Sequence, residues 1–242
     1  MIDDIIKKIA PTGVLRVGVN MSNFLLVNSK DKSGVIDGVS PGIGKKLAKE
    51  LNISFEIVQF ANPGLLADAV DNNEWDIGNI ASEKERGKTI DFSDPYVNID
   101  ANFLFREEDN FKNNNDIDQP GIQIAVFERS AYDLWLSRNI QSAELVRAKG
   151  LDASYELFVS EKLEALAGLS PKLMEENEKM AGSTILPGQF TAVQQSIGCG
   201  KDREEGLAFL VEFVEETKTS GFVADLIEKH GVVGRLSVAP PA

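Results

Sequence analysis

Cysteine and histidine are nearly absent from this sequence, which contains one of each in 242 residues. The single cysteine, Cys199, excludes an internal disulfide and leaves the redox compartment undetermined. The single histidine, His230, argues against serine or cysteine hydrolase chemistry, and no cluster has the spacing of a zinc site. We interpret Cys199 as a structural thiol. His230 lies at the predicted end of a helix, just before Gly231, where it would support the helix dipole.

Positive charge is also scarce. Lysine and arginine total 25 against 38 aspartates and glutamates, so the formal net charge is −13 and the pI about 4.6. An acidic protein of this kind is repelled by nucleic acid and by anionic membrane surfaces, and its charge mainly keeps it soluble. No run approaches the roughly 18 apolar residues that span a bilayer. The stretch Met1–Lys8 lacks the features of a secretory signal, so the protein is either cytosolic or has lost a leader.

Glycine-rich phosphate loops are missing as well. The pair Gly42 and Gly44 is too weak a match to a P-loop or a dinucleotide-binding motif. A group of acidic residues is interpreted as a solvated face rather than as a cation site; it comprises Glu83, Glu85, Asp91 and Asp94. We therefore expect neither a metal nor a cofactor.

What the sequence does contain is an alternation of predicted strands and helices, which favours a largely parallel sheet covered by helices. The length fits one large domain or two smaller ones. The first part predicts strands at 14–19, 53–60 and 76–80, with helices at 40–51 and 65–72. Ser40 is the expected N-cap of the first of these helices, and Pro41 is expected in its first turn.

The same alternation restarts after Tyr96 and indicates a second lobe. Ser130 and Asp133 predict a capping-box-like start for a helix in this lobe. Strands are predicted at 101–105, 122–126, 144–147 and 165–169, and helices at 153–160 and 171–180. Return strands at 184–186 and 192–197 precede two final helices at 204–219 and 222–230.

The most informative segment runs from Asp76 to Tyr96. It ends a hydrophobic strand in a polar turn and then places Arg86 within reach of the same point. An arginine offers a planar fork that matches a carboxylate, and backbone N–H groups at the start of a helical turn add further donors. Ligands of open α/β sheets usually bind at such strand ends. The segment indicates an anion-binding site; the alternative is that Arg86 is a solvated charge in a loop rich in lysine and glutamate.

The Arg86 loop and the run from Asp91 to Tyr96 resemble the polar amino acid branch of the bacterial extracellular solute-binding proteins, the type II periplasmic receptors of ABC importers. The order and spacing of segments support this resemblance from Gly13 through the helix at 40–51 to Gly231. It implies an α/β periplasmic binding protein type II fold, with two α/β lobes joined by a two-strand hinge. Lobe 1 would comprise 1–100 and 192–242, and the inserted lobe 2 would comprise 101–191.

The resemblance also implies a mechanism and a set of partners. A ligand binds one lobe in the inter-lobe cleft, the other lobe closes over it, and the membrane permease of an ABC transporter recognises the closed form. The protein would be a periplasmic monomer whose signal peptide has been removed, with no direct membrane insertion.

Site residues follow from the resemblance position by position. Arg86 matches the arginine that grips a substrate carboxylate, and Ser130 matches a hydroxyl at a helix N-terminus that favours an anion. Asn79 and Ala81 match turn positions that help to bind the ligand, Ala81 through its N–H alone. Phe24 sits where an aromatic ring flanks the ligand. Further polar neighbours in the same loop are Asn20 and Asn23. The alternatives are helix capping for Ser130, the core for Phe24, and a surface turn for Asn20 and Asn23.

Two departures from the family pattern bear on the ligand. Members that bind ordinary α-amino acids carry an aspartate just after the strand at 165–169, where this chain has Leu169. A second aromatic expected near Asn62 is also missing. An unpaired ammonium buried in a closed cleft would cost several kcal/mol, so the ligand lacks one or meets another acceptor. Candidate acceptors are Glu128, Gln194 and Gln195. The sequence thus predicts a small carboxylate-bearing, amino-acid-like metabolite.

Two other functions stay open from the sequence. Some proteins that resemble this family are cyclohexadienyl dehydratases acting on prephenate or arogenate, and Glu128 is the acid that could protonate a leaving hydroxyl. The chain could also be the binding domain of a larger sensory receptor.

Overall fold

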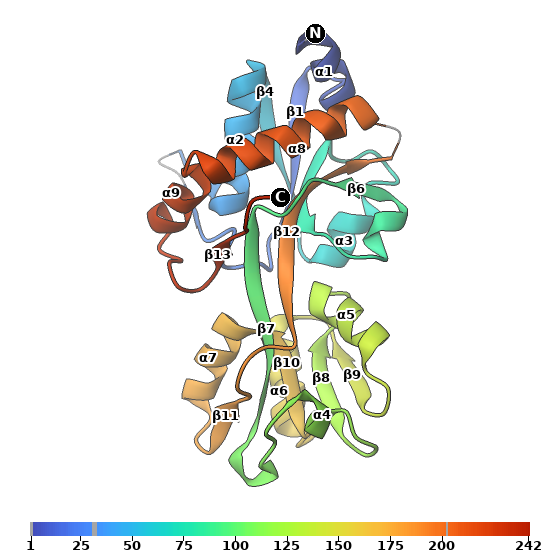
Figure 1. Cartoon of the computed structure of the whole chain (residues 1–242), viewed down its shortest axis with the longest axis vertical. Helices are drawn as coiled ribbons and strands as arrows, with labels where there is room; N and C mark the ends of the chain where they lie inside the picture. The colour runs from blue at the N-terminus through green and yellow to red at the C-terminus, as the bar shows by residue number, and fades with distance from the viewer. Residues whose placement is uncertain (1, 31–32, 202) are drawn as a thin grey trace. The chain divides into compact units, whose positions relative to one another are not determined.

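The computed structural model describes residues 2–30, 33–201 and 203–242. The chain forms two compact units: unit 1 comprises Met1–Asn98 and Gln194–Ala242, and unit 2 comprises Ile99–Val193. The chain passes from one unit to the other within strand β7 (Val97–Arg106) and again within strand β12 (Thr191–Gly200) (Figure 1). Each unit has its own sheet strands and its own covering helices, so a mixed α/β fold is confirmed.

Unit 1 is built on strands in the order β4-β1-β5-β12. Strands β1 (Val14–Asn20), β4 (Ser54–Phe60) and β5 (Ile77–Ala81) are parallel, and β12 runs antiparallel to β5. The alternating side chains Leu15, Val17 and Val19 of β1 are fully buried, as expected for a strand at the centre of a covered sheet. The carboxyl ends of β1 and β5 therefore lie side by side.

Helices cover the sheet of unit 1, and small residues let them approach closely. A Cβ at Gly44, in α2 (Val39–Leu51), would overlap Val17 of β1. A Cβ at Gly18 would overlap Leu66 and press on Trp75, beside α3 (Pro63–Asp68). The remaining helices of this unit are α1 (Ile2–Ile9), α8 (Glu204–Thr219) and α9 (Phe222–Lys229). Helix α8 packs against α1 and α9, and α9 packs against α2.

Unit 2 has the strand order β7-β10-β8-β9. Strand β10 (Ala165–Leu169) is antiparallel to β7, whereas β8 (Gln123–Phe127) is parallel to both β10 and β9 (Glu144–Ala148). Its helices are α4 (Asn114–Ile117), α5 (Ala131–Asn139), α6 (Leu151–Ser160) and α7 (Ser170–Lys179). A separate apolar core includes Leu104, Phe158 and Leu173, so unit 2 is stabilised by its own buried surface.

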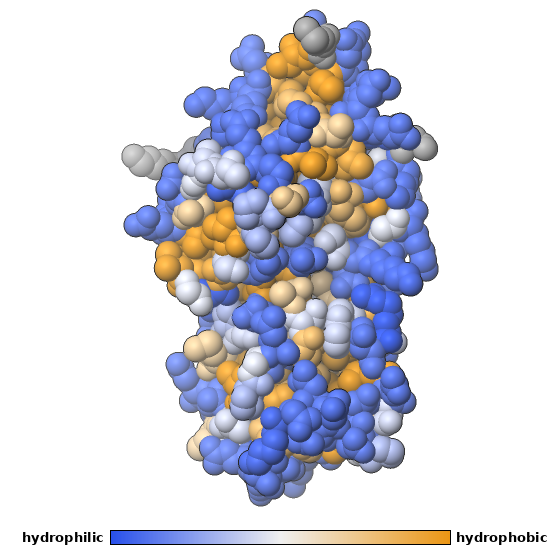
Figure 2. Space-filling model, in the orientation of Figure 1, coloured by the Kyte–Doolittle hydropathy of each residue, from blue (hydrophilic) through white to orange (hydrophobic). Residues whose placement is uncertain are grey.

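Short elements complete the description: β2 (Ser29–Lys30), β3 (Ile36–Asp37), β6 (Ile90–Phe92), β11 (Ser183–Ile185), β13 (Ser237–Val238), η1 (Arg86–Lys88) and η2 (Glu107–Asp109). Within the described ranges, none of the helices combines the length and the apolar character needed to cross a membrane. The face shown in Figure 2 is largely hydrophilic, with apolar residues gathered in several groups.

The predicted start of α2 is wrong. Ser40 does not cap the helix; Gly38 is the N-cap, and Ser40 lies inside the first turn, where its Oγ is 3.0 Å from the Tyr96 hydroxyl. Gly38 has φ 157°, and a Cβ there would lie 2.2 Å from the Leu26 carbonyl oxygen. The close approach of the loop to Gly38 thus fixes where the helix begins.

Candidate functional site

Arg86 lies at the start of η1, just beyond the carboxyl end of β5, and is only 5 % exposed. Its Nη1 donates a hydrogen bond to the Ala81 carbonyl oxygen at 2.8 Å. This bond ties the arginine back to the last residue of the strand and gives the guanidinium a defined orientation. A guanidinium at the end of a parallel strand offers donors that match a carboxylate.

The start of β5 is held by a second arginine. Asp76 is fully buried and accepts hydrogen bonds from Arg16 Nε at 3.1 Å and Nη2 at 2.7 Å. The Arg16 backbone N–H also donates to Asp76, at 2.8 Å. These hydrogen bonds raise the pKa of the Arg16 guanidinium, despite its partial burial. The bidentate pair locks β5 to β1 and so fixes the position of the turn that follows.

Three of the predicted ligand residues share one face of this sheet. Gln195 of β12 is the register partner of Ala81, and Asn79 lies two residues before Ala81 on β5. Side chains two apart on a strand, and directly opposite across a ladder, point to the same side. Asn79 is 2 % exposed, and neither atom of its amide has a hydrogen-bond partner among the described residues. Gln194 is the neighbour of Gln195, and it is exposed whereas Gln195 is buried.

The loop after β1 carries the other predicted residues of unit 1. Asn20 Oδ1 accepts from the Ser22 backbone N–H at 3.1 Å and hydroxyl at 2.8 Å, and Asn23 Oδ1 accepts from the Leu25 N–H at 3.3 Å. Both asparagines therefore stabilise turns. The ring of Phe24 is covered by the Arg235 guanidinium, which lies 5.2 Å from the ring centroid. One aromatic face is thus engaged by a cation.

In unit 2, Ser130 is the N-cap of α5, and its Oγ accepts from the Asp133 backbone N–H at 3.1 Å. The Asp133 side chain does not complete a capping box with Ser130. Instead it accepts from the Arg129 backbone N–H at 2.7 Å and from Arg147 Nε at 3.0 Å. Arg129 has φ 59°, the left-handed region that a non-glycine residue rarely adopts. Asp133 thus holds a strained loop at the end of β8.

Two further sequence predictions concern unit 2. Glu128 is partly exposed, and its backbone N–H donates to the Ala148 carbonyl at 2.9 Å. Leu169 is buried at the end of β10. The predicted ligand residues thus fall into two sets, one in each unit, and their roles in binding stay predictions.

Sequence reasoning missed Arg235, Arg16 and the role of Asp133. Arg235 follows the last predicted helix, with no motif around it. The pairing of Arg16 with Asp76 joins residues far apart in the chain. Asp133 was predicted to serve the helix start, and the signal for its second role was the non-glycine residue Arg129 at a strand-to-helix turn.

Other reactive groups are buried or dispersed. Burial raises the pKa of the Cys199 thiol to about 11. It also raises the pKa of the Tyr96 hydroxyl, although the Ser40 hydroxyl acts in the opposite direction. Among the residues for which the structure gives positions, no group of three or more His, Cys, Asp and Glu side chains is arranged to hold a metal ion.

Comparisons with known proteins agree with this architecture. A curated relative, the L-cystine-binding protein TcyJ of Escherichia coli K12, is 21 % identical over 232 residues, covering 94 % of this chain and 86 % of TcyJ. The ancestral amino acid-binding protein AncCDT-1, described as a precursor of cyclohexadienyl dehydratase, has a TM-score of 0.72 and 25 % identity, covering 94 % of this chain and 98 % of that one.

The amino acid ABC transporter substrate-binding protein AbpA from Streptococcus pneumoniae, bound to L-arginine, has a TM-score of 0.73 and 21 % identity over 93 % of this chain and 97 % of AbpA. These likenesses confirm the type II periplasmic binding protein fold. The model of one family, bacterial extracellular solute-binding proteins, family 3, matches residues 15–233. The chain therefore belongs to the bacterial extracellular solute-binding proteins of family 3.

Proposed function

We propose that this protein is the receptor of an ABC importer and that it binds a small carboxylate-bearing, amino-acid-like metabolite. The observation that carries the proposal is Arg86: a buried guanidinium at the end of a parallel strand, oriented by its bond to Ala81. A carboxylate can accept two parallel N–H bonds from such a fork. The location would be periplasmic, the partner would be a membrane permease, and the protein would act as a monomer.

Other residues are proposed to complete recognition. In unit 1, Gln195 and Asn79 contribute amide groups on one face of the sheet, and Phe24 contributes an apolar ring. In unit 2, Ser130 contributes a hydroxyl at the N-terminus of α5, and Glu128 is the proposed acceptor for any ammonium on the ligand. The amino acids named for TcyJ and AbpA, cystine and arginine, both carry the carboxylate that Arg86 is proposed to bind.

A thermal-shift screen over amino acids, opines, organic acids and betaines will identify the ligand. A compound present at about 100 times its Kd adds roughly 2.7 kcal/mol of stability, a readily measured change. Titration calorimetry with the compound found then tests Arg86. We expect Arg86→Ala to weaken binding about 100-fold, because two charge-assisted hydrogen bonds are lost.

The matched control is Lys84→Ala, which removes the same charge from an exposed position in the same loop. Arg86→Lys keeps the charge but not the fork, and it should fall between the two. Wild-type affinity in the folded Arg86→Ala variant would rule the proposal out. Incubation with prephenate tests the dehydratase alternative, since measurable turnover of prephenate would favour an enzyme over a receptor.

A further inference from the structure

A polar pocket of about 630 Å³ lies in unit 1, where the β2–β3 hairpin meets the C-terminus of α9. We call it the His230 pocket. The residues of its lining that matter here are Ser29, Lys30, Asp37, Lys45, Lys229 and His230. None of them belongs to the ligand residues proposed above, so the pocket has no assigned role in binding the transported solute.

His230 is buried at this position, with a side chain that is 3 % exposed. Its Nδ1 lies 3.2 Å from Ser29 Oγ, and its backbone carbonyl accepts from Asn28 Nδ2 at 2.9 Å. The other ring nitrogen, Nε2, has no hydrogen-bond partner among the described residues. The nearest carboxylate oxygen, Asp37 Oδ1, is 3.8 Å from Nε2, which is too far for a hydrogen bond. A buried ring nitrogen without a partner indicates a missing group.

The tautomer of His230 decides what that group is. If the Ser29 hydroxyl donates to Nδ1, the proton of the neutral ring lies on Nε2, and the nearby Asp37 carboxylate favours this arrangement. Nε2–H is then a donor that lacks an acceptor. If the ring is protonated, Nε2–H is again a donor. In both of these protonation states Nε2–H requires a hydrogen-bond acceptor.

The charges around the pocket define this acceptor further. Lys30, Lys45 and Lys229 contribute positive charge, and Asp37 is the single carboxylate among the described residues of the lining. Asp37 is already engaged, because it accepts from Lys229 Nζ and from the Gly38 backbone N–H, each at 3.0 Å. The lysines outnumber it in a chain whose net charge is −13. The site thus attracts a small anion that can accept several hydrogen bonds.

We propose that the His230 pocket binds a tetrahedral oxyanion of the phosphate or sulfate type, with Nε2–H of His230 as a buried donor and with Lys30 and Lys45 as charge partners. Lys229 donates to Asp37 Oδ2 at 3.0 Å and so offsets the charge of this carboxylate beside the site. Phosphate could reach the pocket as the free ion or as the headgroup of an anionic lipid, since the recognised chemistry is the same.

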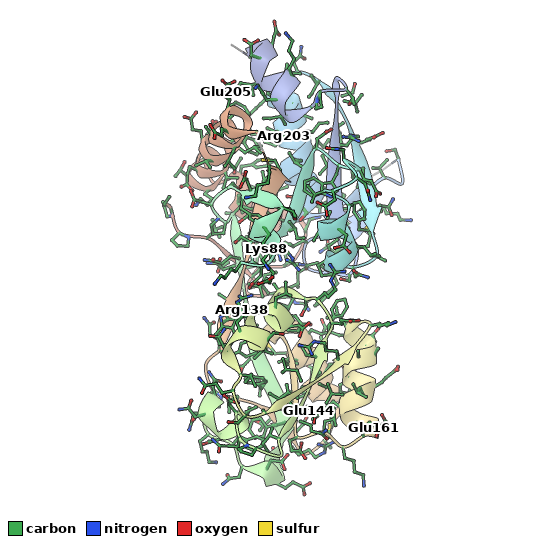
Figure 3. All side chains as sticks on the ribbon, turned by 90° about the vertical axis from the view of Figure 1, so that its right-hand side faces the viewer. Lys88, Arg138, Glu144, Glu161, Arg203 and Glu205 are labelled. Atoms are coloured by element: carbon green, nitrogen blue, oxygen red, sulfur yellow. The ribbon has the colours of Figure 1, made fainter. Side chains whose placement is uncertain are left out.

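A smaller pocket of about 280 Å³ provides a contrast. Its lining includes Lys88, at the end of η1, and Arg203, just before α8, both labelled in Figure 3. It too is rich in basic residues. None of its described lining side chains is a buried polar group without a partner, so charge alone does not make it a comparable site.

The experiment uses the fact that His230 is the only histidine in the sequence. Its imidazole gives a single set of NMR signals in this chain, and these signals need no assignment. Inorganic phosphate and sulfate are titrated against chloride at matched ionic strength. We expect saturable shifts of the His230 signals with phosphate or sulfate but not with chloride.

A bound oxyanion should also raise the pKa of His230. In the structure, burial is the largest cause of the lowered pKa of His230, Asp37 acts to raise this pKa and Lys229 acts to lower it further. Lys30 and Lys45 also line the pocket, and their positive charge opposes protonation. An anion offsets these lysines, so binding should be accompanied by proton uptake near neutral pH.

Two lysines on neighbouring turns of α2 supply the matched variants. Lys45→Gln removes a charge from the pocket lining, whereas Lys49→Gln removes the same charge from an exposed position outside the lining. We expect Lys45→Gln to weaken phosphate binding about 3-fold, the scale of a solvent-exposed charge contact, and Lys49→Gln to have no effect. If both variants weaken phosphate binding equally, the effect comes from the overall charge of the protein and not from the pocket, and the proposal is overturned.

A final arm distinguishes the two sources of phosphate. Vesicles of phosphatidylcholine with or without phosphatidic acid are sedimented with the protein and with the Lys45→Gln variant. Shifts of the His230 signals with inorganic phosphate identify the free ion as the ligand. Sedimentation with phosphatidic acid vesicles that depends on Lys45, without such shifts, identifies the lipid headgroup as the ligand. The absence of both, in protein that is folded by circular dichroism, would refute the site.

Discussion

Units 1 and 2 hold the loops at the ends of their parallel strands by opposite chemistry. In unit 1 the turn after β5 is held by a guanidinium, Arg86, that donates to a backbone carbonyl. In unit 2 the turn after β8 is held by a carboxylate, Asp133, that accepts from a backbone N–H and from Arg147. One unit thus places a guanidinium at its strand end, and the other places a carboxylate there.

This difference shows that the two units contribute different functional groups. The charge that anchors the loop of unit 1 belongs to the residue proposed to bind the ligand. In unit 2 the anchor is a separate side chain, and the group proposed to bind the ligand is the neutral hydroxyl of Ser130. In unit 1 the residue that holds the loop is therefore also the proposed ligand residue, whereas in unit 2 the loop is held by Asp133, which is not proposed to bind the ligand.

The largest effect is expected from Asp76→Ala in unit 1. Removing a fully buried carboxylate leaves Arg16 without its bidentate partner, and breaking a buried pair costs about 3–5 kcal/mol of unfolding free energy. Denaturant unfolding followed by Trp75 fluorescence, in a Trp135→Phe background, reports on unit 1 alone. Asp91→Ala removes the partly exposed ion pair with Lys201 and should cost less than about 1 kcal/mol. Similar losses in both variants would contradict the importance of the buried pair.

A smaller loss, about 1–3 kcal/mol, is expected from Asp133→Ala in unit 2. Arg147 is 40 % exposed on its side-chain surface and can be solvated when its partner is removed, whereas the strained Arg129 backbone loses its acceptor. Amide hydrogen exchange should show lower protection in the residues around Arg129 than in β5. If protection falls equally in both units, the loop is not held locally by Asp133.

Helix caps provide the next comparison, with about 1 kcal/mol expected for each. Ser130→Ala removes the N-cap of α5. Asn62→Ala removes the N-cap of α3, where Asn62 Oδ1 accepts from the Leu65 N–H at 2.9 Å. The two variants should have similar unfolding free energies. Only Ser130→Ala should also weaken ligand binding in calorimetry, so equal affinities in the two variants would leave Ser130 with a capping role alone.

The smallest effects are the losses of stability expected as the pH is lowered. Burial raises the pKa of Asp118 in unit 2, but the backbone N–H groups of residues 141–143 outweigh burial, and the net pKa lies below 3.8. Its contribution to stability is present above pH 3.8 and is lost as the pH falls through the lowered value. In unit 1, burial lowers the pKa of His230 below 6.5, so its contribution is complete above pH 6.5 and declines below it.

Unit 1 should therefore begin to lose stability at a higher pH than unit 2 does. Acid titration with Trp75 and Trp135 as separate fluorescent reporters measures the two onsets. His230→Gln should flatten the unit 1 profile between pH 6.5 and the lowered pKa, and Asp118→Asn should act only on unit 2 in more acidic solution. Coincident onsets in the wild type would show that the units unfold together.

Much of the fold could be predicted from local patterns. The alternation of apolar strands with helices is confirmed, as is the resemblance to the family inferred from the Arg86 loop and the order of the segments. Helix α1 was overlooked although Ile2, Ile5, Ile6 and Ile9 have helical spacing. The hairpin of β2 and β3 has two residues in each strand, too few for a periodic signal.

Features that depend on tertiary contacts could not be predicted. Serine is a preferred N-cap residue, so Ser40 was expected to begin α2. The contact of Ser40 with Tyr96 and the close approach of Leu26 to Gly38 instead place the N-cap at Gly38. The candidate site shows the same limit. Local sequence indicated Arg86 and Ser130, whose roles as ligand residues stay predictions, whereas Arg235 and Arg16 became visible only through partners distant in the chain.

The buried thiol of Cys199 has a practical consequence for spectroscopy. With its pKa raised to about 11 and its surface enclosed, it stays protonated and inaccessible to maleimides at neutral pH. Cysteines introduced at exposed positions would then be the reactive ones. One dye in each unit could be attached without first replacing the native residue, so ligand-driven changes in dye separation could be followed by energy transfer in single molecules.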